Sequence, residues 1–137
     1  MRRQHLAQIT ITVIPPGCQR YTTIGDWTVT EKDGNAFIQI YVSAMNNWRH
    51  EALVGLHEAV EAVLCLYMGT DQQEIDDFDK AFEASGSEGE PGDQWDAPYY
   101  HEHQIATGIE RILAAELGVS WQAYEEDCTA AHAKEKK

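Results

Sequence analysis

Cysteine and long apolar runs are both scarce in this sequence. The 137 residues include three cysteines, which are far apart and form no C-x-x-C pair, so neither a cysteine-rich zinc site nor a disulfide framework is expected. No apolar run reaches the ~18 residues that a bilayer span requires. The apolar residues near the N-terminus alternate with Gln and Thr, which predicts a strand rather than a signal peptide. A cytoplasmic protein with free thiols fits these features.

Basic residues are also scarce, with ten lysines and arginines against 23 acidic residues and a formal net charge of −13. The imbalance is concentrated in residues 71–96, where ten acids accompany a single lysine. Nucleic acid and anionic membranes repel such a chain, so neither is expected as a direct partner. The acidic segment can instead attract cations or a basic surface of another protein.

Hydrophobic periodicity predicts a single domain of the α+β class over residues 1–137. Residues 1–43 carry the period-2 pattern of strands, and Asp33-Gly34 is a strong hairpin signal between residues 26–32 and 35–42. If Lys32 lies opposite Asn35, then Trp27 faces Ile40 and Val29 faces Ile38, so all four apolar side chains share one face. We therefore expect a three-stranded antiparallel sheet with one buried face.

Residues 46–131 have helical periodicity, and about four helices are expected there. The predicted helices are residues 47–68, capped by Asn46 or Asn47 and ended by Gly69, then 73–84, 100–117, and a last helix capped by Ser120. Residues 85–98 are an acidic loop by composition, and residues 132–137 are expected to fray. On the third helix, the predicted buried face consists of Ile105, Ile109, Ile112 and Leu113.

The helix over residues 47–68 is apolar around most of its circumference. Its strongly polar residues fall in one arc of about 120°: His50, Glu51, His57, Glu58 and Glu61. This polar arc is either the solvent face of an amphipathic helix or a metal site. The metal interpretation follows because His57 and Glu61 are four residues apart and can reach one ion, while Glu58 is turned aside toward a water that it can deprotonate. A bound cation also removes the cost of burying an unpaired carboxylate.

Two residues elsewhere in the chain are candidates for completing this site. His103 lies at the start of the third predicted helix, and Asp79 adjoins the apolar stripe of the second. A site of His57, Glu61, His103 and Asp79 contains two imidazoles and two carboxylates, which suits Zn²⁺ and also Mn²⁺ or Fe²⁺. The acidic loop at 85–98 is then either a lid over the site or a solvated segment.

The H-E-x-x-E pattern at residues 57–61 resembles the H-E-x-x-H helix of zincin metallopeptidases. The order of a hairpin followed by this helix is also similar to theirs. The resemblance implies a minimal zincin-like arrangement in which His57 is the first zinc ligand and Glu58 is the general base. Glu61 stands in place of the second histidine. It further implies zinc-dependent hydrolysis of a substrate that the sequence does not identify.

Over most of residues 40–126 the chain also resembles small bacteriophage proteins to which no activity is assigned. These proteins combine an H-E-x-x-E helix, a Phe-rich helix with an Asp, an E-P-G-D loop and an A-P-Y-x-x-x-H helix start. The corresponding segments here are residues 57–61, 78–82, 90–93 and 97–103. This resemblance implies a phage origin and a location in the host cytoplasm.

Two further functions remain open from the acidic residues. Glu58-x-x-Glu61 followed by Glu74-x-x-Asp77 resembles the E-x-x-E…E-x-x-D pattern of all-α NTP pyrophosphohydrolases, whose carboxylates hold Mg²⁺ against a triphosphate. Alternatively, the acids in residues 71–96 suggest a DNA mimic that inhibits a host nucleic-acid-binding protein. The partner would then be a host protein rather than a small-molecule substrate.

Overall fold

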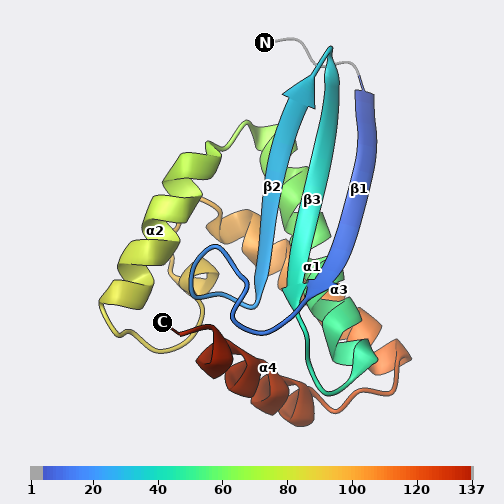
Figure 1. The fold of residues 1–137 in the computed structure, drawn as a ribbon, viewed down its shortest axis with the longest axis vertical. Coiled ribbons are helices and arrows are strands. Elements are labelled where there is room, and N and C mark those ends of the chain that lie inside the picture. Colours follow the sequence, from blue (N-terminus) through green and yellow to red (C-terminus); the bar gives the residue numbers. More distant parts are fainter. Residues whose placement is uncertain (1–4, 137) are drawn as a thin grey trace.

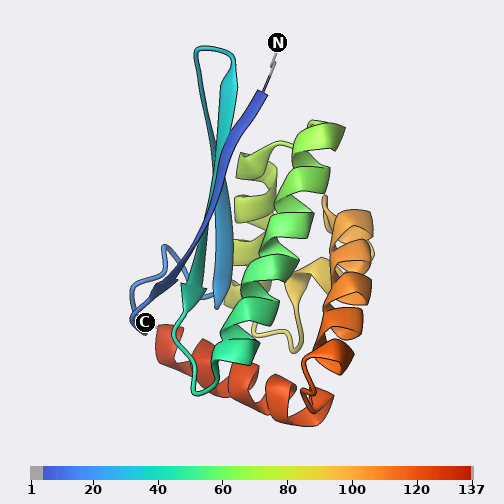
Figure 2. The ribbon, with the colours of Figure 1, turned by 90° about the vertical axis from the view of Figure 1, so that its right-hand side faces the viewer.

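The computed structural model describes residues 5–136 and has an α+β fold, as the sequence predicts (Figure 1). The elements are strands β1 (His5–Ile14), β2 (Gly25–Lys32) and β3 (Asn35–Ser43), helices α1 (Trp48–Met68), α2 (Gln72–Ala84), α3 (Tyr100–Glu116) and α4 (Trp121–Glu135), and a short 3-10 helix η1 (Pro91–Asp93). Helix α1 packs on the sheet, and α3 packs on the side of α1 that is turned away from the sheet (Figure 2).

The β2–β3 hairpin has the predicted register. Trp27 pairs with Ile40, Val29 with Ile38, and Lys32 with Asn35. Both residues of the turn, Asp33 (φ 54°) and Gly34 (φ 80°), have left-handed backbone conformations, as a two-residue hairpin turn requires. The inner face of the sheet, which includes the fully buried Ile38 and Ile40, is thereby turned toward α1.

The expectation of a fully antiparallel sheet is wrong for β1. The strand order is β1-β3-β2, and β1 runs parallel to β3. Successive strands do alternate in direction along the chain. However, β3 lies between β1 and β2 in the sheet. Strand β1 therefore has the parallel strand as its neighbour, and the sheet is mixed.

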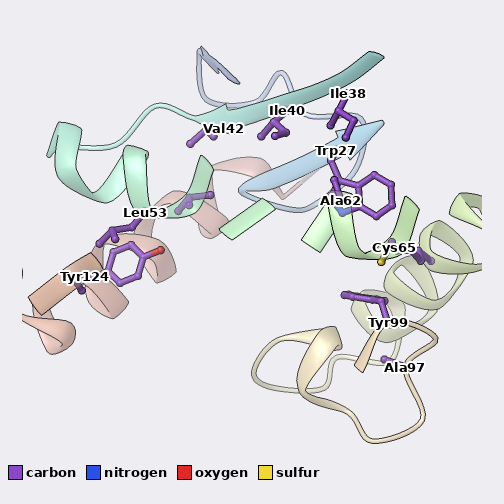
Figure 3. Packing of buried hydrophobic residues seen from close by; sticks show 13 residues of the cluster. Trp27, Ile38, Ile40, Val42, Leu53, Ala62, Cys65, Ala97, Tyr99 and Tyr124 are labelled. Carbon is purple, nitrogen blue, oxygen red and sulfur yellow. The ribbon is translucent and has the colours of Figure 1, made fainter. Parts of the chain in front are cut away.

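Helix α1 has the predicted bounds. Asn47 caps it by accepting a hydrogen bond from the Arg49 backbone N–H (2.9 Å), and Gly69 ends it in the left-handed conformation. Leu53 and Cys65 of α1 belong to the buried apolar cluster, in which Leu53 lies beside Tyr124 (Figure 3). Gly55 faces β1, where an added Cβ would lie 2.7 Å from the Ile11 side chain. No helix within residues 5–136 has the combination of length and apolar character that crossing a membrane requires.

The predicted buried face of α3 is wrong for its three isoleucines, whereas Leu113 is half-buried and packs against the core. Ile105, Ile109 and Ile112 are 42, 38 and 65% exposed, while His103 and Glu110 are buried. The reason is that α3 turns its polar residues toward the polar arc of α1, so hydrogen bonds rather than an apolar stripe join these two helices. The isoleucines are consequently left on the outside.

The expectation that residues 132–137 fray is wrong for the part that the structure describes. Helix α4 continues to Glu135, whose side chain is completely buried. Its carboxylate accepts hydrogen bonds from the backbone N–H of Gly17 (2.9 Å) and of Gln19 (3.3 Å) and from Ser43 Oγ (2.9 Å). These donors come from distant parts of the chain, so the composition of the segment alone gives no sign of them. The remaining predicted positions, residues 1–4 of the sheet segment and 137 of the tail, lie outside the described residues.

Candidate metal centre

The polar arc of α1 lies in the interior of the molecule. His50, His57 and Glu61 are 6, 7 and 4% exposed, and Glu51 and Glu58 are half-buried. The interpretation of this arc as a solvent face is therefore wrong. Buried histidines and carboxylates need partners, and here α3 supplies them for His57 and Glu61.

His57, Glu61 and His103 each direct one donor atom to a corner of a small triangle, which we call the ligand triangle. His57 Nε2 is 3.2 Å from His103 Nδ1, which is 2.9 Å from Glu61 Oε2. The third side, from His57 Nε2 to Glu61 Oε2, is 3.3 Å. Two ligands at about 2.0 Å from a tetrahedral ion lie about 3.3 Å apart. The ligand triangle thus has the size of one face of a zinc coordination sphere.

A hydrogen-bonded chain behind His57 fixes the orientation of its ring. His57 Nδ1 lies 2.7 Å from Glu110 Oε1, and the hydroxyl of Tyr124 donates to the other oxygen of Glu110. A carboxylate at Nδ1 holds a proton there, which leaves the Nε2 lone pair for the ligand triangle. Metal-binding histidines commonly have such a carboxylate partner, because it orients the ring and raises its basicity.

Glu61 is also held by a hydrogen bond from behind, and the ring of His103 is packed against η1. The indole Nε1–H of Trp27 donates to Glu61 Oε1 (3.1 Å), so Oε2 is the oxygen that remains for an ion. His103 Nε2 lies 3.2 Å from Asp93 Oδ1 in η1, but the two atoms do not form a hydrogen bond. Gly92 lies against the His103 ring, where an added Cβ would come within 2.4 Å of Cγ. Residues 85–98, predicted as a loop, therefore include a helical turn that covers one ligand.

The members of the ligand triangle shift one another's pKa values. Burial alone would lower the pKa of His57, but its contacts with Glu110 and Glu61 raise that pKa well above the ordinary value. Burial would raise the pKa of Glu61, yet hydrogen bonds from His103 and His57 lower it to about 2. Glu61 is therefore ionised at neutral pH, and its charge favours a proton or a divalent ion between the two rings.

Glu58 lies outside the ligand triangle and lines an adjacent cavity of about 70 Å³. This cavity has room for a few waters, and Glu61 and His103 line it as well. Burial and the negative charge of Glu61 raise the pKa of Glu58 well above its ordinary value. The geometry thus places an unusually basic carboxylate next to two members of the ligand triangle.

The structure brings together three of the four predicted ligands. The donor atoms of His57, Glu61 and His103 form one group that fits a metal ion, whereas Asp79 does not belong to it. Asp79 lines the same cavity, but its carboxylate accepts hydrogen bonds from the hydroxyls of Tyr99 (2.6 Å) and Tyr21 (3.0 Å). Asp79 consequently shapes the wall of the cavity and holds two tyrosines.

Several functional residues were not found from the sequence. Glu110 lies seven residues after His103, close to two helical turns, so both side chains lie on the same face of the helix. This spacing is the one sequence signal that points to Glu110. Trp27, Tyr124 and Asp93 show no such signal, because nothing in their local sequence separates them from core or surface residues. Their roles depend on contacts between distant elements.

The acidic residues behind the alternative functions are dispersed in the structure. Of the predicted carboxylate quartet, Glu74 and Asp77 are exposed and do not line the cavity with Glu58 and Glu61. The acids of residues 71–96 are likewise divided, since Asp76 and Asp79 are buried while others are exposed. Asp76 is paired with Arg20 at 3.0 Å.

Comparison with known proteins yields no relative. No family model matches the chain, and no curated protein or solved structure matches it either. The function is therefore inferred from the geometry of the site.

The outer support of His57 leads to a first prediction. Glu110→Gln removes the carboxylate charge behind Nδ1 while keeping the shape of the side chain. We expect metal affinity to fall about 10–100-fold, the usual effect of losing an outer-shell partner. Competition with a chromophoric chelator measures this change. Glu116→Gln, on an exposed position of the same helix, is the matched control and should bind like the wild type. Equal affinities for both variants would show that Glu110 does not support a ligand.

Proposed function

We propose that this protein is a metal-dependent hydrolase of zincin-like type, with Zn²⁺ held by His57, Glu61 and His103. The ligand triangle is the observation that carries the proposal. Catalytic zinc sites have three protein ligands and an open position, whereas structural sites usually have four ligands. Two imidazoles and one carboxylate also suit Mn²⁺ and Fe²⁺, so the same side chains can hold those ions.

Glu58 is the general base in this proposal. When bound, the ion supplies Lewis acidity and lowers the pKa of a coordinated water toward ~7. The carboxylate of Glu58, which lines the cavity beside Glu61 and His103, would accept a proton from water there. Burial and the charge of Glu61 raise the pKa of Glu58, which makes its carboxylate a stronger base than an exposed one. Trp27 and Glu110 meanwhile hold the two ligands of α1 in place.

The proposal is tested in two steps. Elemental analysis of purified protein should show near-stoichiometric zinc, manganese or iron, or binding of one of them on titration. Hydrolysis of a panel of peptide and ester substrates should then be lost about 10²–10⁴-fold in Glu58→Gln, with the metal content unchanged. A protein that neither contains nor takes up a metal would refute the whole proposal. Full activity in Glu58→Gln would refute the role of the base.

Metal binding is expected to depend on pH because it displaces protons. The raised pKa of His57 means that its imidazole is charged near pH 7 in the metal-free protein, and only the neutral ring can bind an ion. Affinity should therefore rise about tenfold per pH unit, for each displaced proton, until the pH passes that raised pKa. Calorimetry in two buffers of different ionisation enthalpy should show at least one proton released per ion. Binding without proton release would contradict the assigned ligand.

The suggested biological setting extends this proposal. The likeness of residues 57–61, 78–82, 90–93 and 97–103 to phage proteins supports a phage-encoded hydrolase that acts in the host cytoplasm. An acidic cavity wall, with Asp26, Asp76, Asp79 and Glu90 around Glu58, favours substrates that are not anionic at the reacting end.

A further inference from the structure

Exposed apolar side chains gather on one side of the molecule, away from the ligand triangle. They come from β1, from the outer side of α1 and from α3, which lie next to one another on the side that faces the viewer in Figure 2. We call this set the apolar face, and its members are Leu6, Ile9, Ile11, Val13, Leu56, Val63, Tyr67, Ile105, Ile109 and Ile112. Contiguous apolar surface of this extent is uncommon on a free monomer and marks an interaction site.

Strand β1 contributes an unpaired edge to the apolar face. It is the outermost strand beside β3, and its ten residues contain no Asp, Glu, Lys, Arg or Pro. Folded monomers usually protect such edges with charges, prolines or bulges, because a bare edge pairs with another strand. A bulge occurs only between Leu6 and Gln8, so the run from Ile9 to Ile14 is regular.

The inner face of β1 is also incompletely covered. Ile9, Ile11 and Val13 are in register with Ile38, Ile40 and Val42 of β3, so all six side chains point to the helix side of the sheet. The β3 residues are fully buried beneath α1, whereas the β1 residues remain 41–47% exposed. Another element packed beside α1 on the same face of the sheet would bury these β1 side chains.

The distribution of charge favours a second copy of this chain as the occupant. The chain carries a net charge of −13, so two copies repel each other unless they meet where no acid lies. None of the ten members of the apolar face is charged, and β1 contains no Asp, Glu, Lys or Arg. The acids of α1 belong to its inward polar arc, and Arg49 of α1 is half-buried and donates a hydrogen bond to the Leu117 carbonyl. A basic partner would instead be drawn to the acidic surfaces elsewhere.

The strand also complements itself. Antiparallel pairing of two β1 strands about Thr10 places Ile9 opposite Ile11 on the inner face and Gln8 opposite Thr12 on the outer face. The two-fold axis of such a pair is perpendicular to the sheet, so each α1 lies on the same side of the joined sheets. The outer sides of the two α1 helices then face each other across the axis, as an isologous interface requires.

We propose that two copies of this chain form a symmetric dimer through the apolar face, with β1 pairing antiparallel to β1 of the second copy. Stable interfaces involve about 20–30 residues on each side. The ten residues of β1, with three members of the apolar face from α1 and three from α3, supply 16 of these. The dimer leaves the ligand triangle untouched and is independent of the proposed hydrolase function.

Light scattering and sedimentation equilibrium of the full chain, from 1 to 200 µM, test the dimer. The expected mass is twice the 15.4 kDa of one chain. Leu56→Glu and Val63→Glu each place a charge against the two-fold axis and should raise the dissociation constant at least ~100-fold. Trp95→Glu is the control, because Trp95 is 83% exposed but lies outside the apolar face. Circular dichroism verifies that each variant is folded.

Two results would overturn the dimer. A wild-type mass of one chain across the whole concentration range excludes self-association through this face. A dimer that persists in both Leu56→Glu and Val63→Glu, with Trp95→Glu behaving identically, shows that the copies meet elsewhere. Hydrogen exchange of the β1 amides gives a second readout, because these amides should become more protected as the wild type dimerises and should not do so in Leu56→Glu.

Discussion

His57→Ala should lower the affinity for the metal by more than ~100-fold and reduce the bound metal to background. The variant removes one corner of the ligand triangle and the only ligand whose ring is held by a buried carboxylate and a tyrosine hydroxyl. Removing a ligand should lower metal affinity more than removing an outer-shell partner does, and the latter lowers it up to ~100-fold. Elemental analysis and chelator competition measure the change, and Glu61→Ala should behave in the same way.

His50→Ala is the matched control for this experiment. His50 lies in the same arc of α1, is buried to the same degree and also pairs with a carboxylate, Asp127, at 2.7 Å. It therefore loses a similar buried contact without touching the ligand triangle. A chelator should lower the melting temperature of the wild type and of His50→Ala, but it should not affect His57→Ala. Equal metal content in the two histidine variants would rule out the assigned site.

Glu135→Ala should have the largest effect on stability outside the metal site, about 3 kcal/mol or more. The substitution removes a completely buried carboxylate that accepts hydrogen bonds from Gly17, Gln19 and Ser43. Each buried donor that is left without an acceptor lowers the free energy of unfolding by about 1–3 kcal/mol. Urea unfolding measures the free energy of unfolding. Glu125→Ala on the exposed side of α4 should change it by less than ~0.5 kcal/mol. Similar values for both variants would mean that the end of α4 does not secure the fold.

Features that depend on neighbouring residues were predictable from the sequence. The Asp33-Gly34 turn sets the hairpin register, and the cap at Asn47 and the glycine at Gly69 set the bounds of α1. These signals act within a few residues of each other, so no knowledge of the tertiary structure is needed. The parallel pairing of β1 was not predictable, because strand direction does not specify which strand becomes the neighbour.

The same distinction applies to the site. The spacing of His57 and Glu61 is a property of one helix, and it correctly places both side chains on one side of α1. Trp27 and Tyr124 support the site from other elements, so their roles require the assembled fold. Asp79 was assigned from proximity in sequence to an apolar stripe, but Tyr99 and Tyr21 take up its oxygens.

The error at α3 has a more general physical cause. An apolar stripe on a helix normally marks its buried side, because burial of apolar surface is the main driving force of folding. In α3 the need to pair His103 and Glu110 with the polar arc of α1 decides the orientation of the helix. Ile105, Ile109 and Ile112 are left exposed in the single chain and become part of the face that we assign to the dimer.

A crystal grown with zinc and measured at the zinc absorption edge tests the metal centre most directly. We expect one strong anomalous peak about 2.0–2.2 Å from His57 Nε2, His103 Nδ1 and a Glu61 oxygen, with a further coordination position open toward the cavity that Glu58 lines. No anomalous peak between these three side chains, or a zinc ion bound only by surface residues such as Glu90 and Asp93, would contradict it.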